Sequence, residues 1–207
     1  MRADQSVHAS SAFDVRQALA EATAPAHRAL HVHPWIARLN APDLSVQVYG
    51  QILLAYYSIY TEVEARRVAA DVFAGLGLGP AVSALAADIS ALGKRRATRW
   101  CPVSAAWTEP VEILGALYVL HGSGFGARVL NASIARNLPA VPRNYFALGT
   151  SPILWRKLKG ALQAFADEPA GQEKLIASAN ATFFRVGQAV TRHCEDRTDT
   201  PTADAKL

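Results

Sequence analysis

The chain has 207 residues, 51% of them apolar, with a formal net charge of +4 and two cysteines. This size suits one domain with a sizeable core, and the scarcity of cysteine excludes a disulfide-rich scaffold. The basic residues form no stripe interleaved with aromatic residues, which argues against nucleic-acid binding. No apolar stretch approaches the roughly 18 to 20 residues that cross a bilayer, and the polar N-terminus lacks a signal-peptide core. We therefore expect a cytoplasmic protein without a membrane span.

Both ends of the chain, residues 1–11 and 195–207, are polar and patternless. We expect them to be disordered tails around one helical domain at 12–194. The first helix is predicted at 12–31, where Pro25 either kinks it or divides it in two. In the second case Thr23 would cap the second piece. Pro34 should end this helix, before a short helix at 35–39.

The clearest helix is predicted at 45–70, because its apolar residues alternate in steps of three and four. They form one stripe, which is expected to be buried: Val46, Tyr49, Leu53, Tyr56, Tyr60 and Val63. Polar residues that include Gln51 and Glu62 occupy the opposite face. Further helices are predicted at 80–95, 108–137, 150–166 and 171–193, with a proline-rich loop at 138–149. No segment alternates apolar and polar residues over six or more positions, so we predict an all-α fold.

Three glycines, Gly122, Gly124 and Gly126, interrupt the otherwise helix-forming stretch 117–130. Each costs about 1 kcal/mol relative to alanine inside a helix, so a compensating role is expected. One interpretation is a strand at 113–120 followed by a dinucleotide-binding turn, although the expected acidic residue about 20 positions on is absent. The other is one long helix that bends so that its backbone lies close to a flat ligand. Close helix packing alone would also explain the glycines.

Three histidines fall within seven residues, at His27, His31 and His33. His27 and His31 share one helix face, a spacing that suits chelation of a metal such as zinc. Neither an HExxH pattern nor a carboxylate cluster accompanies them. The residues themselves leave open a surface pair and a single imidazole that serves as an axial haem ligand.

Four segments, in order along the chain, resemble the sequence signatures of haem oxygenases, most closely the bacterial, phytochrome-associated type. They are Ala22–His27, Tyr56–Glu64, Gly122–Leu130 and Ala179–Phe183. The resemblance implies a single-domain, multi-helix haem oxygenase-like fold. It also implies oxidative cleavage of haem to biliverdin, CO and iron, with O₂ and with electrons from a ferredoxin or a reductase.

Carried onto this chain, the resemblance makes His27 the proximal iron ligand through Nε2. Gly122 and Gly126 would let the distal helix bend over the haem, Ser123 would organise distal water, and Arg128 matches an arginine of the bacterial motif. Further residues are expected to bind the haem or its propionates: Thr23, Arg16, Tyr118, Arg156 and Lys159.

Three positions depart from the family pattern. His121 stands where bacterial members usually have glutamate, Ala127 replaces the second glycine of a pair, and Phe125 adds bulk beside the glycines. These departures keep a second hypothesis open, a non-catalytic haem-binding or sensory protein on the same fold.

Overall fold

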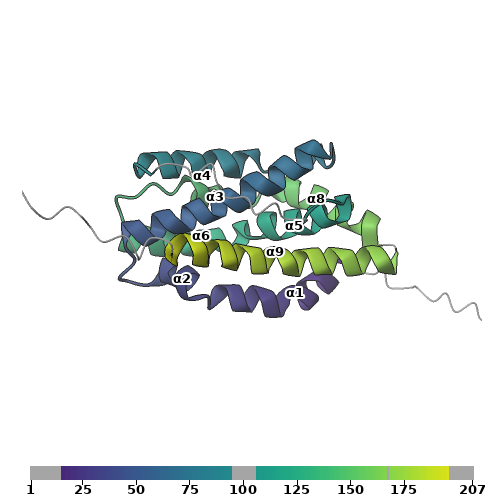
Figure 1. The fold of residues 1–207 in the computed structure, drawn as a ribbon, viewed down its shortest axis with the longest axis horizontal. Coiled ribbons are helices and arrows are strands. Elements are labelled where there is room, and N and C mark those ends of the chain that lie inside the picture. Colours follow the sequence, from purple (N-terminus) through teal and green to yellow (C-terminus); the bar gives the residue numbers. More distant parts are fainter. Residues whose placement is uncertain (1–14, 95–105, 167, 196–207) are drawn as a thin grey trace, which may run out of the picture.

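The computed structural model describes residues 15–94, 106–166 and 168–195. Within these ranges the chain forms helices and no strand, which confirms the all-α prediction (Figure 1). The predicted tails lie outside the described residues, except for Glu195, which is the last residue of the final helix rather than the first residue of a tail.

The described helices follow one another along the chain as α1 Val15–His31, α2 Pro34–Ala37, η1 Arg38–Asn40, α3 Val46–Ala69, η2 Ala74–Leu76, α4 Gly79–Ala91, α5 Pro110–Gly122, α6 Gly124–Asn137, α7 Asn144–Leu148, α8 Pro152–Ala166 and α9 Pro169–Glu195, where η marks a 3₁₀ turn. The long helix α9 packs against α5, α3, α1 and α8. Figure 1 shows α1 along one side of α9, with α3 and α4 on the other side.

Helices α3, α5 and α9 supply much of the core, which includes the fully buried side chains of Leu53, Ile113 and Val190. At the crossing of α5 and α9 the backbones approach so closely that a Cβ on Gly115 would lie 2.9 Å from the carbonyl oxygen of Leu175. Glycine is required there because any side chain would force the two helices apart.

Helix α1 contains Pro25 and continues through it to His31. The proposed cap at Thr23 is therefore wrong: its hydroxyl is buried and donates a hydrogen bond to the Leu19 carbonyl, at 2.7 Å. Pro34 lies in the first turn of α2, a position that needs no backbone N–H donor.

Helix α3 begins after Ser45, whose Oγ accepts a hydrogen bond from the Val48 N–H at 3.2 Å. Most of the predicted stripe is buried, but Val46 is 45% exposed. Gln51, expected on the polar face, is buried, and both carboxyl oxygens of Glu62 are buried as well. The reason is that α3 packs against α9, α4 and α5, so it has no single solvent face.

Two described segments, Ala74–Ala91 and Pro110–Asn137, are long and apolar enough to cross a membrane by length and composition alone. No segment of this kind was expected from the sequence. The first includes the break between η2 and α4, and the second includes the junction at Ser123. The apolar residues of α5 lie in the core. The absence of a membrane span stays a prediction.

Candidate functional site

The glycine segment forms two helices joined by one residue. Helix α5 ends at Gly122 and α6 begins at Gly124, while Ser123 keeps helical dihedral angles and donates its N–H to the Val119 carbonyl at 3.0 Å. The stretch 113–120 is helix, so the dinucleotide-binding interpretation is wrong. The interpretation as one long helix with an interruption at the glycines agrees with this geometry.

The three glycines have different surroundings. A Cβ on Gly124 would lie 2.9 Å from the carbonyl carbon of Gly149, so close packing requires this glycine. A Cβ on Gly122 would make an ordinary contact of 3.9 Å with the Trp155 ring. A Cβ on Gly126 would meet no described atom within 4 Å. Packing therefore explains Gly124 and leaves Gly126 facing open space.

A chain of contacts connects α1 to the glycine segment. Tyr118, one turn before Gly122, shares a hydrogen bond with Thr23 of α1. Burial raises the pKa of Tyr118, while this hydrogen bond and the nearby charge of Arg16 act in the opposite direction. The Tyr118 ring lies 6.0 Å from that of Trp155, which makes an edge-to-face contact with Phe125 at 4.8 Å. Three residues that the sequence singled out, Tyr118, Phe125 and Gly122, thus lie around Trp155, which the sequence did not single out.

His27 lies one turn beyond Thr23, and its side chain is exposed. Its ring is 5.6 Å from that of Phe183, and its Nε2 is 3.1 Å from Nε2 of His31. Partial burial lowers the pKa of His27, and the neighbouring His31 and Arg28 lower it further. The imidazole is therefore neutral at neutral pH, the form that binds a metal ion. Its hydrogen bond and ring contacts involve α1 and α9 rather than the glycine segment.

The Ser123 side chain belongs to a network of hydroxyl groups. Its Oγ donates to the Leu120 carbonyl at 2.8 Å and lies 2.9 Å from the Tyr60 hydroxyl. Tyr60 also donates to Leu120, and its hydroxyl lies 2.8 Å from that of Tyr145. Burial, above other causes, raises the pKa of both tyrosines, so both hydroxyls stay protonated. Tyr145, which lies in the predicted loop, is a member that sequence reasoning missed.

The tyrosine network depends on a buried carboxylate. Oδ1 of Asp88 accepts hydrogen bonds from the backbone and side-chain amides of Asn144, at 3.0 and 2.7 Å. Oδ2 accepts from the Tyr145 N–H at 3.0 Å. These bonds satisfy amides at the start of α7, inside the segment predicted to be a loop.

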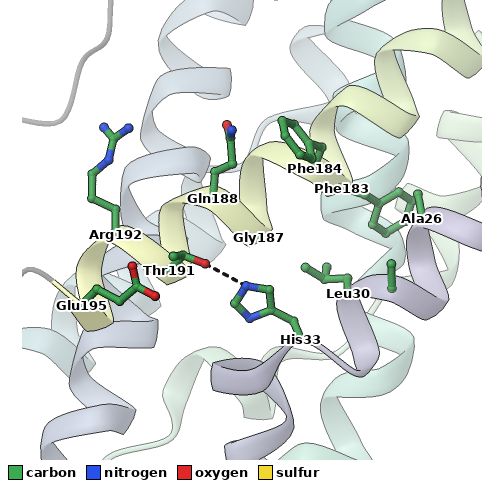
Figure 2. A pocket seen from close by; sticks show the side chains of 11 residues that line it. Ala26, Leu30, His33, Phe183, Phe184, Gly187, Gln188, Thr191, Arg192 and Glu195 are labelled. Carbon is green, nitrogen blue, oxygen red and sulfur yellow. Dashed lines mark hydrogen bonds between the residues drawn. The ribbon is translucent and has the colours of Figure 1, made fainter.

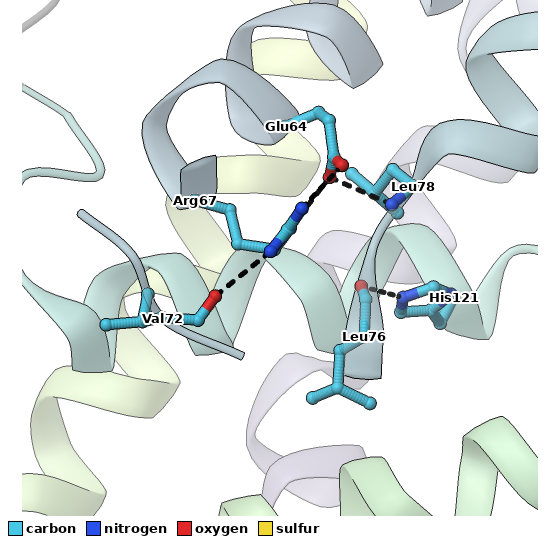
Figure 3. Close-up of polar contacts among 6 residues, drawn as sticks. All are labelled: Glu64, Arg67, Val72, Leu76, Leu78 and His121. Atoms are coloured by element: carbon cyan, nitrogen blue, oxygen red, sulfur yellow. Dashed lines mark hydrogen bonds and ion pairs between the residues drawn. The ribbon is translucent and has the colours of Figure 1, made fainter. Parts of the chain in front are cut away.

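His121, which departs from the family pattern, has a structural role: it connects α5 to the 3₁₀ turn η2. Its Nε2 donates a hydrogen bond to the Leu76 carbonyl in η2 at 2.9 Å (Figure 3). Burial lowers the pKa of His121, although the Leu76 hydrogen bond and nearby Glu64 oppose that shift. Glu64 in turn binds Arg67 at 2.7 and 2.9 Å and accepts from the Leu78 N–H at 2.9 Å. His121 and this ion pair hold the segment around η2 against α3 and α5.

The predicted basic residues lie on three helices: Arg16 on α1, Arg128 on α6, and Arg156 and Lys159 on α8. All four are exposed. Because α8 packs against α1, cations from both helices are available near one side of the molecule.

A cavity of about 570 Å³ lies between α1 and α9 (Figure 2), a size typical of small-molecule sites. His33 points across it, with Nε2 2.9 Å from the Thr191 hydroxyl. Nδ1 of His33 is buried without a hydrogen-bond partner. The lining includes Phe183 and Phe184 but neither His27 nor the glycine segment. The cavity is therefore not the site predicted from the sequence, which gave no signal for it beyond His33.

No family model matches the chain. A haem oxygenase of Xanthomonas campestris pv. campestris (strain 8004) is 27% identical, over 70% of this chain and 90% of that protein. The solved haem oxygenase of Leptospira interrogans superimposes with a TM-score of 0.66 at 17% identity, over 87% of this chain and 100% of that one.

Haem oxygenase-1 of the cyanobacterium Synechocystis sp. PCC6803, solved in complex with haem, also gives a TM-score of 0.66, at 15% identity, over 87% of this chain and 92% of that one. The phytochrome-associated subtype stays a prediction. The chain is therefore similar to haem oxygenases, in its fold over most of its length and in its sequence over 70% of it.

Proposed function

We propose that the protein cleaves haem oxidatively to biliverdin, CO and iron, with His27 as the proximal ligand. The observation that carries the proposal is the match to a haem oxygenase over most of that relative's length, on the fold that the Synechocystis protein uses with bound haem. The cytoplasmic location and an electron donor such as a ferredoxin or a reductase are parts of the same proposal. The net charge of +4 favours an acidic donor.

The residues present fit a flat, apolar, iron-containing substrate. His27 offers an exposed, neutral imidazole. Gly126 faces open space, and large apolar side chains are exposed on α6 and α8: Phe125 and Val129 on α6 by 59% and 67%, and Ile153 on α8 by 65%. Exposed apolar side chains gain free energy when a ligand covers them.

Each group of residues has a part in this proposal. His27 would hold the iron, and the hydrogen bond between Thr23 and Tyr118 would help to position α1 against α5. Arg16, Arg156 and Lys159 would pair with the propionates, and Gly122 and Gly126 would leave room for the macrocycle. Haem, when bound, supplies the iron at which O₂ reacts and the carbon skeleton that is cleaved. The hydroxyl of Ser123, which Tyr60 holds in place, would hold water on the distal side, and Arg128 would lie at its edge.

The test is a haemin titration of the purified protein, followed by addition of a reductant. We expect the Soret band of a histidine-ligated haem, which then converts to a biliverdin spectrum. The variant His27→Ala should lose the histidine-ligated spectrum. An unchanged haem spectrum in that variant would disprove the ligand assignment.

A second candidate, a haem-binding protein without turnover, rests on Phe125. Of the three residues that depart from the family pattern, Ala127 is buried in the core and His121 is bonded to Leu76. Their contacts within the protein explain both residues without a role toward haem. Phe125 is exposed next to the open space at Gly126. A stable haem complex that yields no bilin under reductant would favour this candidate. If Phe125→Leu forms bilin and the unaltered protein does not, the Phe125 ring is what prevents turnover.

A further inference from the structure

His27 and His31 lie one turn apart on α1, and both side chains are exposed. Their rings are 4.4 Å apart and inclined at 69°, with the two Nε2 atoms 3.1 Å from each other. The two Nε2 atoms therefore lie side by side on the same face of the helix. One proton is shared between them in the haem-free protein, because a hydrogen bond needs one donor and one acceptor.

The separation of these nitrogens matches a chelate. Zinc–imidazole bonds are about 2.0–2.1 Å long, so two nitrogens 3.1 Å apart subtend roughly 100° at an ion bonded to both. This angle lies between the values for octahedral and tetrahedral coordination. The charge of the adjacent Arg28 opposes a bound cation, which favours an exchangeable ion over a tightly held one.

We propose that His27 and His31 form a two-histidine site for a divalent transition-metal ion of the class of Zn²⁺ or Cu²⁺. The described residues contain no cluster of three or more histidine, cysteine or carboxylate side chains that would complete a closed site. Water would fill the other coordination positions, so the ion is exchangeable rather than structural. The ion replaces the proton that the two rings share.

This site also regulates access to haem, a consequence that rests on the proposed function. Nε2 of His27 has one lone pair, which either the divalent ion or the haem iron can use. Occupancy by the ion therefore excludes haem from His27, and by linkage bound haem excludes the ion. The competition between the ion and haem depends on His31, because His31 binds the ion in the chelate but does not bind the iron in a single-histidine haem complex.

The first experiment uses haem-free, full-length protein, titrated with Zn²⁺ in a calorimeter. We expect one bound ion, and a loss in affinity of about tenfold or more in either His31→Ala or His27→Ala. His33→Gln is the matched control, because it removes a nearby imidazole, keeps an amide for Thr191 and leaves the pair intact. Equal zinc affinity of the unaltered protein and His31→Ala would overturn the proposal.

The second experiment titrates haemin with and without saturating Zn²⁺. We expect zinc to weaken haem binding about tenfold or more in the unaltered protein and in His33→Gln, but not in His31→Ala. Equal inhibition of His31→Ala would overturn the competition. A protein that binds zinc through the pair but no haem would refute the proposed function and leave the metal site standing, so the two failures are distinguishable.

Discussion

Asp88 is a fully buried carboxylate on α4 that accepts three hydrogen bonds from the first residues of α7. Without it, two backbone amides and one side-chain amide would be left without an acceptor in the interior. We predict that Asp88→Ala lowers the free energy of unfolding by about 2–3 kcal/mol, the usual cost of losing a buried, charge-assisted hydrogen-bond acceptor. Urea denaturation measures this value.

The control is Asp43→Ala, which removes the partner of Arg38 in an exposed ion pair with a distance of 3.0 Å. Exposed pairs contribute less than about 1 kcal/mol, so this variant should unfold close to the unaltered protein. Equal effects of the two substitutions would contradict the role given to Asp88.

His121 makes the protein sensitive to acid. Its pKa in the folded state lies below the ordinary value of 6.5, chiefly because it is buried. The unfolded chain then binds the proton more readily, so the stability contributed by neutral His121 is complete above about pH 6.5 and is lost as the pH falls below it. We predict that His121→Gln, which can still donate to Leu76 and does not titrate, loses less thermal stability between about pH 7.5 and 5.5. Parallel melting-temperature profiles would contradict this prediction; the other histidines are common to both proteins.

At the scale of elements, two glycines near the junction of α5 and α6 differ in their surroundings: Gly124 is closely packed, and Gly126 faces open space. We predict that Gly124→Ala lowers the free energy of unfolding by about 1–3 kcal/mol, because its Cβ would press on the backbone of Gly149. Gly126→Ala should instead stabilise the haem-free protein by up to about 1 kcal/mol, since it improves helix propensity in open space.

The same pair of variants tests the site. If a flat ligand occupies the space beside Gly126, then Gly126→Ala should weaken haem binding while it raises the melting temperature. A substitution that stabilises the protein and leaves the haem titration unchanged would show that the ligand lies elsewhere.

Much of the element order could be predicted from the sequence, because periodic apolar residues and proline positions act locally. The helix after Ser45, the helix that begins at Pro152 and the interruption at the glycines are examples. Helix α7 could not be predicted, because its cap, Asp88, lies 56 residues away. The burial of Gln51 likewise depends on how many helices surround α3, which periodicity within one helix does not reveal.

The candidate site was predictable only in part, for the same reason. The resemblance predicts roles for His27, Thr23, Tyr118 and the glycines, and the structure brings Thr23 and Tyr118 into contact. The roles of Trp155 and Tyr145 follow from contacts across the fold, between residues with no common local pattern.

At the scale of the whole molecule, stability is distributed unevenly. Helices α3, α5 and α9 are buried against several neighbours, whereas α1 packs mainly on α9 and presents several exposed residues. We predict that amide hydrogen exchange is slowest in α3, α5 and α9 and faster in α1 beyond Pro25. Exchange in α1 as slow as in α5 would contradict this distribution.

Pro25 weakens α1 two residues before His27. Because proline carries no N–H, the carbonyl of Glu21 lacks its usual partner four residues on, and the segment that follows is tied to the rest of the helix by one bond fewer. Opening of that segment should therefore cost less free energy than opening of the core of α3, α5 and α9. A wide, rigid ligand that must pass beside His27 would then need only the last turns of α1 to open, and not the whole fold.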